Sequence, residues 1–189
     1  MIHSSRFVAV LDANALYPAP TRDYLLRLAS LDLYKPKWTN EIQEEWIRNL
    51  LLNRPDLMRE KLDITQDAMN SAFPDANITN YEELIAGLSL PDAKDKHILA
   101  AAIRGNADVI VTFNLKDFPY RYLKTYDIEV QHPDEFVSNL INLDKTKSEN
   151  ALQSLIKSLR NPPKTREEVL NTLEKCGLRN TVSILKEDD

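Results

Sequence analysis

Four acidic residues, far apart in the sequence, each stand where a side chain can reach a shared crevice. They are Asp12, Glu45, Asp95 and Asp117. Asp12 closes the apolar run 7–11, and Asp117 lies in the turn that follows the apolar run 109–111. In α/β proteins, ligands collect at the carboxyl ends of parallel strands. Carboxylates gathered there raise one another's pKa unless a cation neutralises them, and oxygen ligands suit Mg²⁺ or Mn²⁺. The pattern therefore predicts a metal-dependent hydrolase.

Helix capping is the structural alternative to a functional role for the aspartates. An Asp at a strand exit often caps the next helix, so Asp12 and Asn14 can divide capping and chemistry between them. Asp92 follows Pro91 at the start of a predicted helix, and capping alone explains it. Asp95 borders the buried face of that helix, one turn before Ile98, where an unpaired carboxylate would be costly. Asp95 is therefore the stronger functional candidate of the two.

Three glutamates compete within one predicted helix, which begins after Thr39 as a plausible N-cap. Glu41 and Glu45 share a face of this helix, whereas Glu44 lies about 100° around the axis from Glu45. A single glutamate on a helix is usually a solvated side chain. Only the presence of the other acids supports a functional role for it. The residues themselves leave the choice between Glu41 and Glu45 open.

Composition excludes several classes of protein. The chain has 189 residues, 43% of them hydrophobic, which fits one domain with a small appendage. Its net charge of −5 argues against a large basic surface for nucleic acid, although a bound cation can reverse the field at the site itself. Three scattered glycines exclude a glycine-rich phosphate loop. Asn14 stands where a phosphatase of the haloacid dehalogenase type needs a second Asp. Metal-assisted hydrolysis is what remains.

The remaining special residues carry no recognisable chemistry. One cysteine, Cys176, excludes an intramolecular disulfide framework, and no Cys/His spacing supports zinc. The three histidines have no ligand spacing, so we expect surface or packing roles for His3, His97 and His132. Trp38 and Trp46 are expected in the core. The amino terminus lacks a signal-peptide core and no apolar stretch approaches the ~20 residues needed to cross a bilayer, which predicts a cytoplasmic protein without membrane contact.

Apolar spacing predicts strands that alternate with helices, and hence an α/β fold with a parallel sheet. Strands are expected at 7–11, 33–38, 108–112 and 128–130, and helices at 25–31, 39–51, 57–73, 92–105 and 133–141. After Asp144 the strand signals stop and three amphipathic helices follow, one opened by the capping-box pair Thr165 and Glu168. We therefore expect two parts, residues 1–142 and a helical extension, residues 143–189. From residue 145 onward the charge is +2, against −7 for the residues before it, so the extension could contact RNA or a partner.

As an ordered set, these motifs resemble a known family. The set is the strand-ending Asp12, Thr39 followed six residues later by Glu45, the run Asp95-Lys96-His97-Ile98-Leu99-Ala100-Ala101-Ala102, and the run Val111-Thr112-Phe113-Asn114-Leu115-Lys116-Asp117-Phe118. Residues 7 to about 140 resemble PIN-domain ribonucleases, and the last motif is similar to that of VapC-type toxins of type II toxin–antitoxin pairs. The stretch from Arg160-Asn161-Pro162-Pro163 onward resembles the helical C-terminal region of a VapC subgroup. In this family pattern the spacing from Thr39 selects Glu45.

The resemblance implies a PIN-like three-layer α/β/α sandwich with a central parallel sheet, plus a C-terminal helical extension. It implies Mg²⁺ or Mn²⁺ and endonucleolytic cleavage of RNA by metal-activated water, without a protein nucleophile. The implied site consists of Asp12 and Asp95 as principal metal ligands, Glu45 and Asp117 as ligands or water-positioning groups, and Thr112, Asn114 and Asp92 as orienting groups.

The resemblance also implies an RNA substrate and a cognate antitoxin, and it allows a homodimer. Lys94, Lys96 and Lys116 could contact substrate phosphates, although surface lysines are usually only solvated. The alternatives are an RNA-processing or quality-control nuclease, a structure-specific DNA nuclease, and a non-catalytic PIN scaffold that binds RNA or protein. The short chain disfavours the DNA nuclease, and the presence of all four acids disfavours the scaffold.

Overall fold

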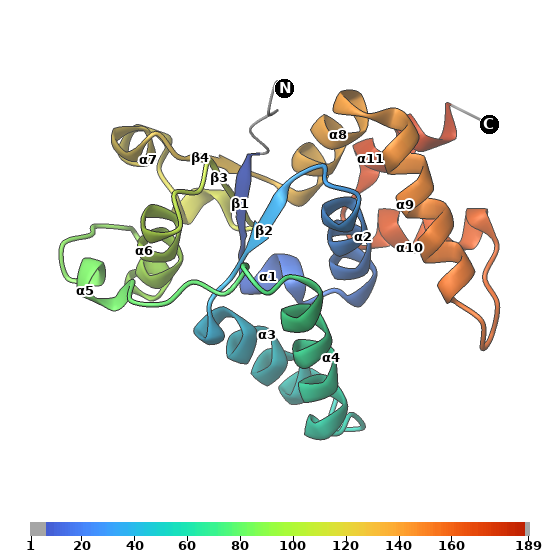
Figure 1. Cartoon of the computed structure of the whole chain (residues 1–189), viewed down its shortest axis with the longest axis horizontal. Helices are drawn as coiled ribbons and strands as arrows, with labels where there is room; N and C mark the ends of the chain where they lie inside the picture. The colour runs from blue at the N-terminus through green and yellow to red at the C-terminus, as the bar shows by residue number, and fades with distance from the viewer. Residues whose placement is uncertain (1–6, 188–189) are drawn as a thin grey trace.

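A sheet of four parallel strands, in the order β2-β1-β3-β4, forms the centre of the computed structural model, which describes residues 7–187 (Figure 1). The strands are β1 (Val8–Leu11), β2 (Lys35–Lys37), β3 (Val109–Val111) and β4 (Glu129–Gln131). Val8 pairs with Lys35 on one side of β1, and Ala9 pairs with Val109 on the other. The predicted parallel sheet is confirmed. His3 lies outside the described residues.

The second strand begins slightly later than the sequence suggested. Leu33 and Tyr34 were expected to open it, but both are buried in the core just before β2. The strand itself contains Pro36, which lacks a backbone N–H and is therefore tolerated only at a sheet edge. β2 is indeed an edge strand.

Helices surround the sheet. The longer ones are α2 (Ala19–Ser30), α3 (Asn40–Asn53), α4 (Arg59–Ala72), α6 (Lys96–Arg104), α8 (Pro133–Leu143), α9 (Lys145–Ser158), α10 (Arg166–Lys175) and α11 (Arg179–Lys186). The 3₁₀ turn η1 (Ala93–Asp95) forms the start of the helix predicted at 92–105. The sequence did not predict the one-turn helices α1 (Ala13–Leu16), α5 (Glu82–Ile85) and α7 (Tyr120–Leu123), nor the 3₁₀ turns η2 (Leu115–Asp117) and η3 (Lys124–Tyr126). Segments this short carry no periodic signal.

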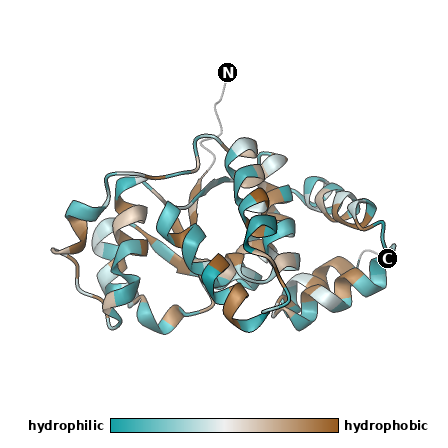
Figure 2. Ribbon diagram, turned by 90° about the horizontal axis from the view of Figure 1, so that it is seen from below, coloured by the Kyte–Doolittle hydropathy of each residue, from teal (hydrophilic) through white to brown (hydrophobic). Residues whose placement is uncertain are grey.

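The layers match the predicted α/β/α sandwich. Helix α6 packs against β1 and β3 on one side of the sheet, and α2 lies on the other side (Figure 1). The α3–α4 hairpin lies below the end of the sheet where β1 leads into α1 (Figure 1). Hydrophobic residues concentrate where the helices meet the sheet (Figure 2), and both Trp38 and Trp46 are fully buried as expected.

The helices after α8 form the expected helical extension. Helix α9 packs against α2, where the Tyr24 hydroxyl donates to the Ser148 carbonyl oxygen at 3.2 Å. Helix α11 packs against α8, where the Asp134 carboxylate accepts the backbone N–H groups of Asn180 and Thr181 at 2.8 Å. Between residues 7 and 187, no helix is both long and apolar enough to cross a membrane.

Candidate active site

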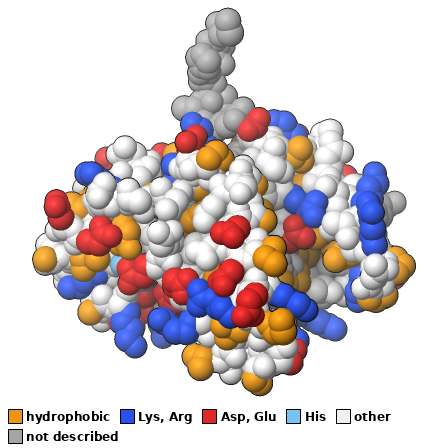
Figure 3. Space-filling view, turned by 60° about the horizontal axis from the view of Figure 1, so that its bottom comes forward, with side chains coloured by type: hydrophobic (Ala, Val, Ile, Leu, Met, Phe, Trp, Pro, Cys, Tyr) orange, Lys and Arg blue, Asp and Glu red, His pale blue; other side chains and the backbone are white. Residues whose placement is uncertain are grey.

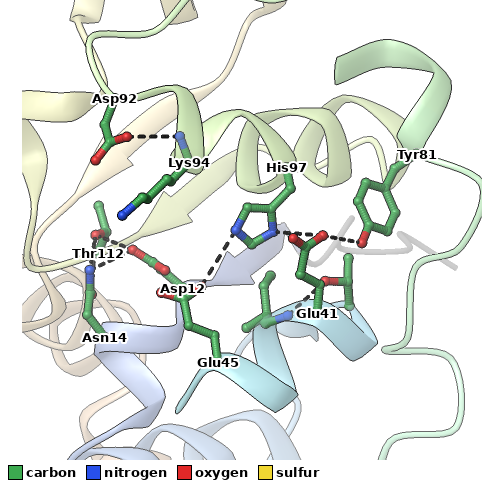
Figure 4. A network of polar contacts seen from close by, with 11 residues as sticks. Asp12, Asn14, Glu41, Glu45, Tyr81, Asp92, Lys94, His97 and Thr112 are labelled. Atoms are coloured by element: carbon green, nitrogen blue, oxygen red, sulfur yellow. Dashed lines mark hydrogen bonds and ion pairs between the residues drawn. The ribbon is translucent and has the colours of Figure 1, made fainter. Parts of the chain in front are cut away.

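Asp12 stands at the exit of β1, and its side chain is 5% exposed. Its backbone N–H donates to the Val111 carbonyl at 3.0 Å, so β1 and β3 hold it at the end of the sheet. One carboxylate oxygen, Oδ2, accepts hydrogen bonds of 2.6 Å from both the Thr112 hydroxyl and the Asn14 amide (Figure 4). The side chain makes no capping bond to α1. Asp12 thus occupies the N-cap position of α1 without the side-chain bond that the capping alternative requires.

Asn14 and Thr112 join α1 to the loop after β3. The Asn14 side-chain oxygen accepts the Phe113 backbone N–H at 2.9 Å, and the Thr112 hydroxyl accepts the Asn114 backbone N–H at 3.0 Å. The Asn114 side-chain amide in turn donates to Asp117 Oδ2. Asn14, which the sequence suggested only as a cap, thus orients the loop that carries three of the predicted site residues.

Asp92 and Asp95 lie on the approach to α6. Asp92 Oδ1 accepts the Lys94 backbone N–H at 2.9 Å, which is the capping role expected for it (Figure 4). Asp95 ends η1 and occupies the N-cap position of α6 without making a capping bond. Its Oδ2 atom is buried and has no hydrogen-bond partner among the described residues. An unpartnered carboxylate oxygen at such a position calls for a ligand.

Helix α3 brings Glu41 and Glu45 to the same side of the site. Thr39 caps this helix, because its side chain accepts the Ile42 N–H at 3.1 Å. Glu44 points away and forms a 2.6 Å ion pair with Arg59 of α4. The helical geometry expected for the three glutamates is therefore present.

His97 joins the two glutamates, which sequence reasoning missed. The imidazole is buried, with Nδ1 3.6 Å from a Glu41 carboxylate oxygen and Nε2 3.6 Å from a Glu45 carboxylate oxygen (Figure 4). The expectation of a histidine that only packs or faces solvent was wrong for His97. The sequence did contain a signal for a role of His97 near the site, because His97 lies two residues after Asp95. His132 instead accepts the Asp134 backbone N–H at the start of α8.

The electrostatics show how closely the acids gather. Burial raises the pKa of Asp95 to about 6, and the charges of four other acids add to this rise. These acids are Asp12, Asp92, Asp117 and Glu45. Burial also raises the pKa of Asp12 and Glu45 adds to it, although the Thr112 hydrogen bond acts in the opposite direction. Asp12 and Asp95 are thus harder to ionise because of burial and their acidic neighbours, which is the situation that a cation relieves.

Burial alone would lower the pKa of His97. The nearby carboxylate of Glu45, together with the charges of Glu41 and Asp12, outweighs burial and raises the pKa. These carboxylates therefore favour the protonated form of the imidazole on one side of an otherwise acidic site. Helix α3 and the amino-terminal end of α6 meet at this side chain.

The donor chemistry fits a divalent cation of the oxygen-preferring kind. The unpartnered Asp95 Oδ2 and the raised pKa of both Asp12 and Asp95 mark an uncompensated negative site. Within residues 7–187, no three Asp, Glu, His or Cys side chains are arranged to hold a metal ion by themselves. Mg²⁺ usually keeps several waters and takes only one or two carboxylates together with substrate phosphates. An open group of acids therefore suits this ion better than a closed cage would.

Basic side chains border the acids. Figure 3 shows carboxylates gathered on one face of the molecule, with Lys and Arg side chains beside them. In Figure 4, the Lys94 side chain extends from η1 toward Asp12, Asn14 and Thr112. Lys96 is half-buried and Lys116 is exposed. A substrate phosphate bound beside the acids would thus have a lysine ammonium group near it.

Comparison with known proteins places these features in a family. The family model described as PIN domain matches residues 8–116, more than half of the chain, and the model described as VapC50 C-terminal domain matches residues 133–187. A protein of Mycobacterium tuberculosis (strain ATCC 25618 / H37Rv), named "Putative ribonuclease VapC50", is 39% identical over 93 residues. That match covers 49% of this chain and 54% of the relative, about half the length of each. No solved structure matches the chain.

Proposed function

Because the chain belongs to the PIN-domain family, we propose that it is a divalent-metal-dependent endoribonuclease. The observation that carries this proposal is the convergence on Asp95 of acids from three other segments, Asp12, Glu45 and Asp117, whose charges add to burial in raising its pKa. Similarity to a relative named as a ribonuclease supports RNA as the substrate. The order of the motifs along the chain also agrees with a PIN-domain ribonuclease.

The proposed cation is Mg²⁺ or Mn²⁺. Asp12 and Asp95 would hold it, with Glu45 and Asp117 as further ligands or as groups that orient water. When bound, such a cation lowers the pKa of water and neutralises charge on the phosphoryl oxygens.

The chain's own residues would supply the positioning. Thr112 and Asn14 fix the Asp12 carboxylate through two short hydrogen bonds. Asn114 fixes Asp117, and Asp92 orders the turn that leads to Asp95. Lys94 extends toward Asp12 and would contact a non-bridging oxygen of the substrate phosphate. Catalysis of phosphodiester hydrolysis then depends on placement and electrostatics rather than on a protein nucleophile.

Within the ribonucleases, we propose the role of a toxin that a cognate antitoxin restrains in the cytoplasm. The support is the match of both parts of the chain to PIN and VapC50 C-terminal models, together with the VapC50 relative. A toxin should arrest the growth of a bacterial host when it is expressed alone, and Asp12→Asn should restore growth. Unimpaired growth at a high level of active protein would contradict this role.

Cleavage of single-stranded RNA by the purified full chain tests the enzymatic proposal. We expect cleavage with Mg²⁺ or Mn²⁺, none with EDTA, and a loss of at least about 100-fold in Asp12→Asn, because metal-site acids act in the transition state. Asp63→Asn is the matched control, since Asp63 is half-exposed on α4 and forms its ion pair with Arg59 of the same helix. Equal cleavage by wild type and Asp12→Asn would overturn the proposal.

A further inference from the structure

The imidazole of His97 lies between two carboxylates that are one helical turn apart on α3. Each ring nitrogen faces one of them at 3.6 Å, and the side chain is only 8% exposed (Figure 4). His97 itself belongs to the first turn of α6, directly after Asp95 and Lys96. One side chain thus connects the helix that carries Glu45 to the turn that carries Asp95.

Packing alone does not account for this arrangement. A buried imidazole between two carboxylates costs desolvation free energy, and an apolar side chain of similar volume would fill the same space without that cost. A buried polar group of this kind needs a role that its polar contacts serve. Here both contacts are made to acids on the site-facing side of one helix.

The second carboxylate is itself held in place. The buried Tyr81 hydroxyl donates to Glu41 Oε2 at 2.9 Å, the same oxygen that faces His97 (Figure 4). The order of contacts is therefore Tyr81, Glu41, His97 and Glu45. Glu41 is 54% exposed and Glu45 34% exposed, so without these contacts both could turn toward solvent.

Electrostatic repulsion from the other acids favours rotation of the Glu45 side chain toward solvent. Glu45 acts on both Asp12 and Asp95 as a like charge, which pushes its carboxylate away from the group where it would be useful. A donor close to the Glu45 carboxylate opposes this repulsion. Of the residues described, His97 supplies that donor, and no salt bridge to a Lys or Arg does so.

We propose that His97 is a positioning residue that holds Glu45 against the repulsion of the other acids, and that Glu41 orients the imidazole for this task. The inference rests on the proposed function, because Glu45 matters only if the acids bind a cation. Partners that orient metal-binding residues commonly change metal affinity or activity by about 10- to 100-fold when they are removed.

The test uses the purified full chain and three variants. His97→Phe keeps an aromatic ring of similar size but has no N–H. Glu41→Gln removes the charge of a half-exposed side chain and keeps an oxygen that can accept the Tyr81 hydroxyl. Glu44→Gln is the matched control, because Glu44 is on the same helix but pairs with Arg59. For each protein, calorimetry measures the Mn²⁺ dissociation constant without RNA, circular dichroism measures Tm, and cleavage kinetics give kcat and KM.

We expect His97→Phe to weaken Mn²⁺ binding about tenfold or more and to lower kcat with little change in KM for RNA. Glu41→Gln should weaken Mn²⁺ binding by a few-fold, and the double variant should be no worse than His97→Phe alone, because both act through one contact chain. Glu44→Gln should equal wild type.

Two failures are distinguishable. If wild type binds Mn²⁺ and cleaves RNA while a folded His97→Phe does both equally well, the positioning role is overturned and the proposed function stands. If His97→Phe does not fold, Glu41→Gln decides, and wild-type Mn²⁺ affinity in that variant overturns the inference. If wild type neither binds Mn²⁺ nor cleaves RNA, the proposed function and this inference fall together.

Discussion

At the scale of single residues, Asp95 carries a conflict between stability and the proposed activity. Its pKa is raised from 3.8 to about 6, so the folded chain binds this proton more tightly than the unfolded chain does. The associated stabilisation is fully present below pH 3.8 and is lost as pH rises through about 6. An ionised Asp95 without a cation therefore destabilises the fold at neutral pH.

Asp95→Asn should accordingly abolish RNA cleavage and yet raise the Tm of the metal-free protein at pH 7.5. Because Asp95 is half-exposed, solvent screening limits the gain to about 1 kcal/mol, which corresponds to roughly 2–4 °C. The difference should shrink toward pH 4.5, where the wild-type carboxyl is protonated in the folded state. Thermal melts in EDTA at both pH values measure this. A variant that melts below wild type at pH 7.5 would contradict it.

Lys94 gives a second prediction at this scale, since its side chain extends toward Asp12 and makes no salt bridge within residues 7–187. Lys94→Ala should raise KM for RNA about three- to tenfold with kcat little changed, and it should reduce the salt dependence of binding by about one unit of slope. Lys186→Ala is the control, because Lys186 is an exposed residue at the end of α11. An unchanged KM would contradict the phosphate contact and would mean that Lys94 is only a solvated surface lysine.

At the scale of elements, the start of α3 determines where Glu41 and Glu45 lie. Thr39 is fully buried and caps the helix through a 3.1 Å bond from the Ile42 N–H. Thr39→Ala should cost about 1 kcal/mol of stability, or roughly 2–4 °C in Tm, and should also lower kcat, because fraying shifts both glutamates.

A second capped helix provides the comparison for that prediction. Thr165 caps α10 with a full capping box that includes Glu168, on the helical extension. Thr165→Ala should cost a similar amount of stability but leave kcat as in wild type. Equal kcat losses in both variants would mean that the effect on cleavage comes from general destabilisation rather than from the placement of α3.

At the scale of the whole molecule, the helical extension is packed into the same core as the rest of the chain. Leu152, Leu173 and Val182 are buried, and Tyr24 of α2 donates to Ser148 of α9. We predict that a fragment of residues 1–142 loses cooperative melting or aggregates, because removal of the extension exposes apolar surface on α2 and α8. Each large apolar side chain contributes about 1.5–3 kcal/mol, whereas total stability is only about 5–15 kcal/mol.

Circular dichroism melts and gel filtration of the fragment, beside the full chain at equal concentration, test this prediction. A monomeric fragment that melts cooperatively within a few degrees of the full chain would contradict it. That outcome would instead support residues 1–142 as an independently folding unit, and the extension as a separable module for partner contacts.

The features of this protein that local chemistry encodes could be predicted from the amino-acid sequence. Alternating apolar periods predicted the parallel sheet and its flanking helices, Thr39 and Thr165 marked helix starts, and Asp12 and Asp117 stood out at strand exits. These signals are local because helix caps, turns and side-chain periodicity depend on neighbours within a few residues.

Only the tertiary structure decided which side chains support those acids. The contact of His97 with Glu41 and Glu45 depends on how α3 approaches α6, and the Asn14 bonds to Thr112 and Phe113 depend on the pairing of β1 with β3. These residues are tens of positions apart, and no spacing within either segment specifies the distance between them. Long-range packing fixes that distance because burial of the apolar faces, rather than any polar motif, sets where the helices and strands meet.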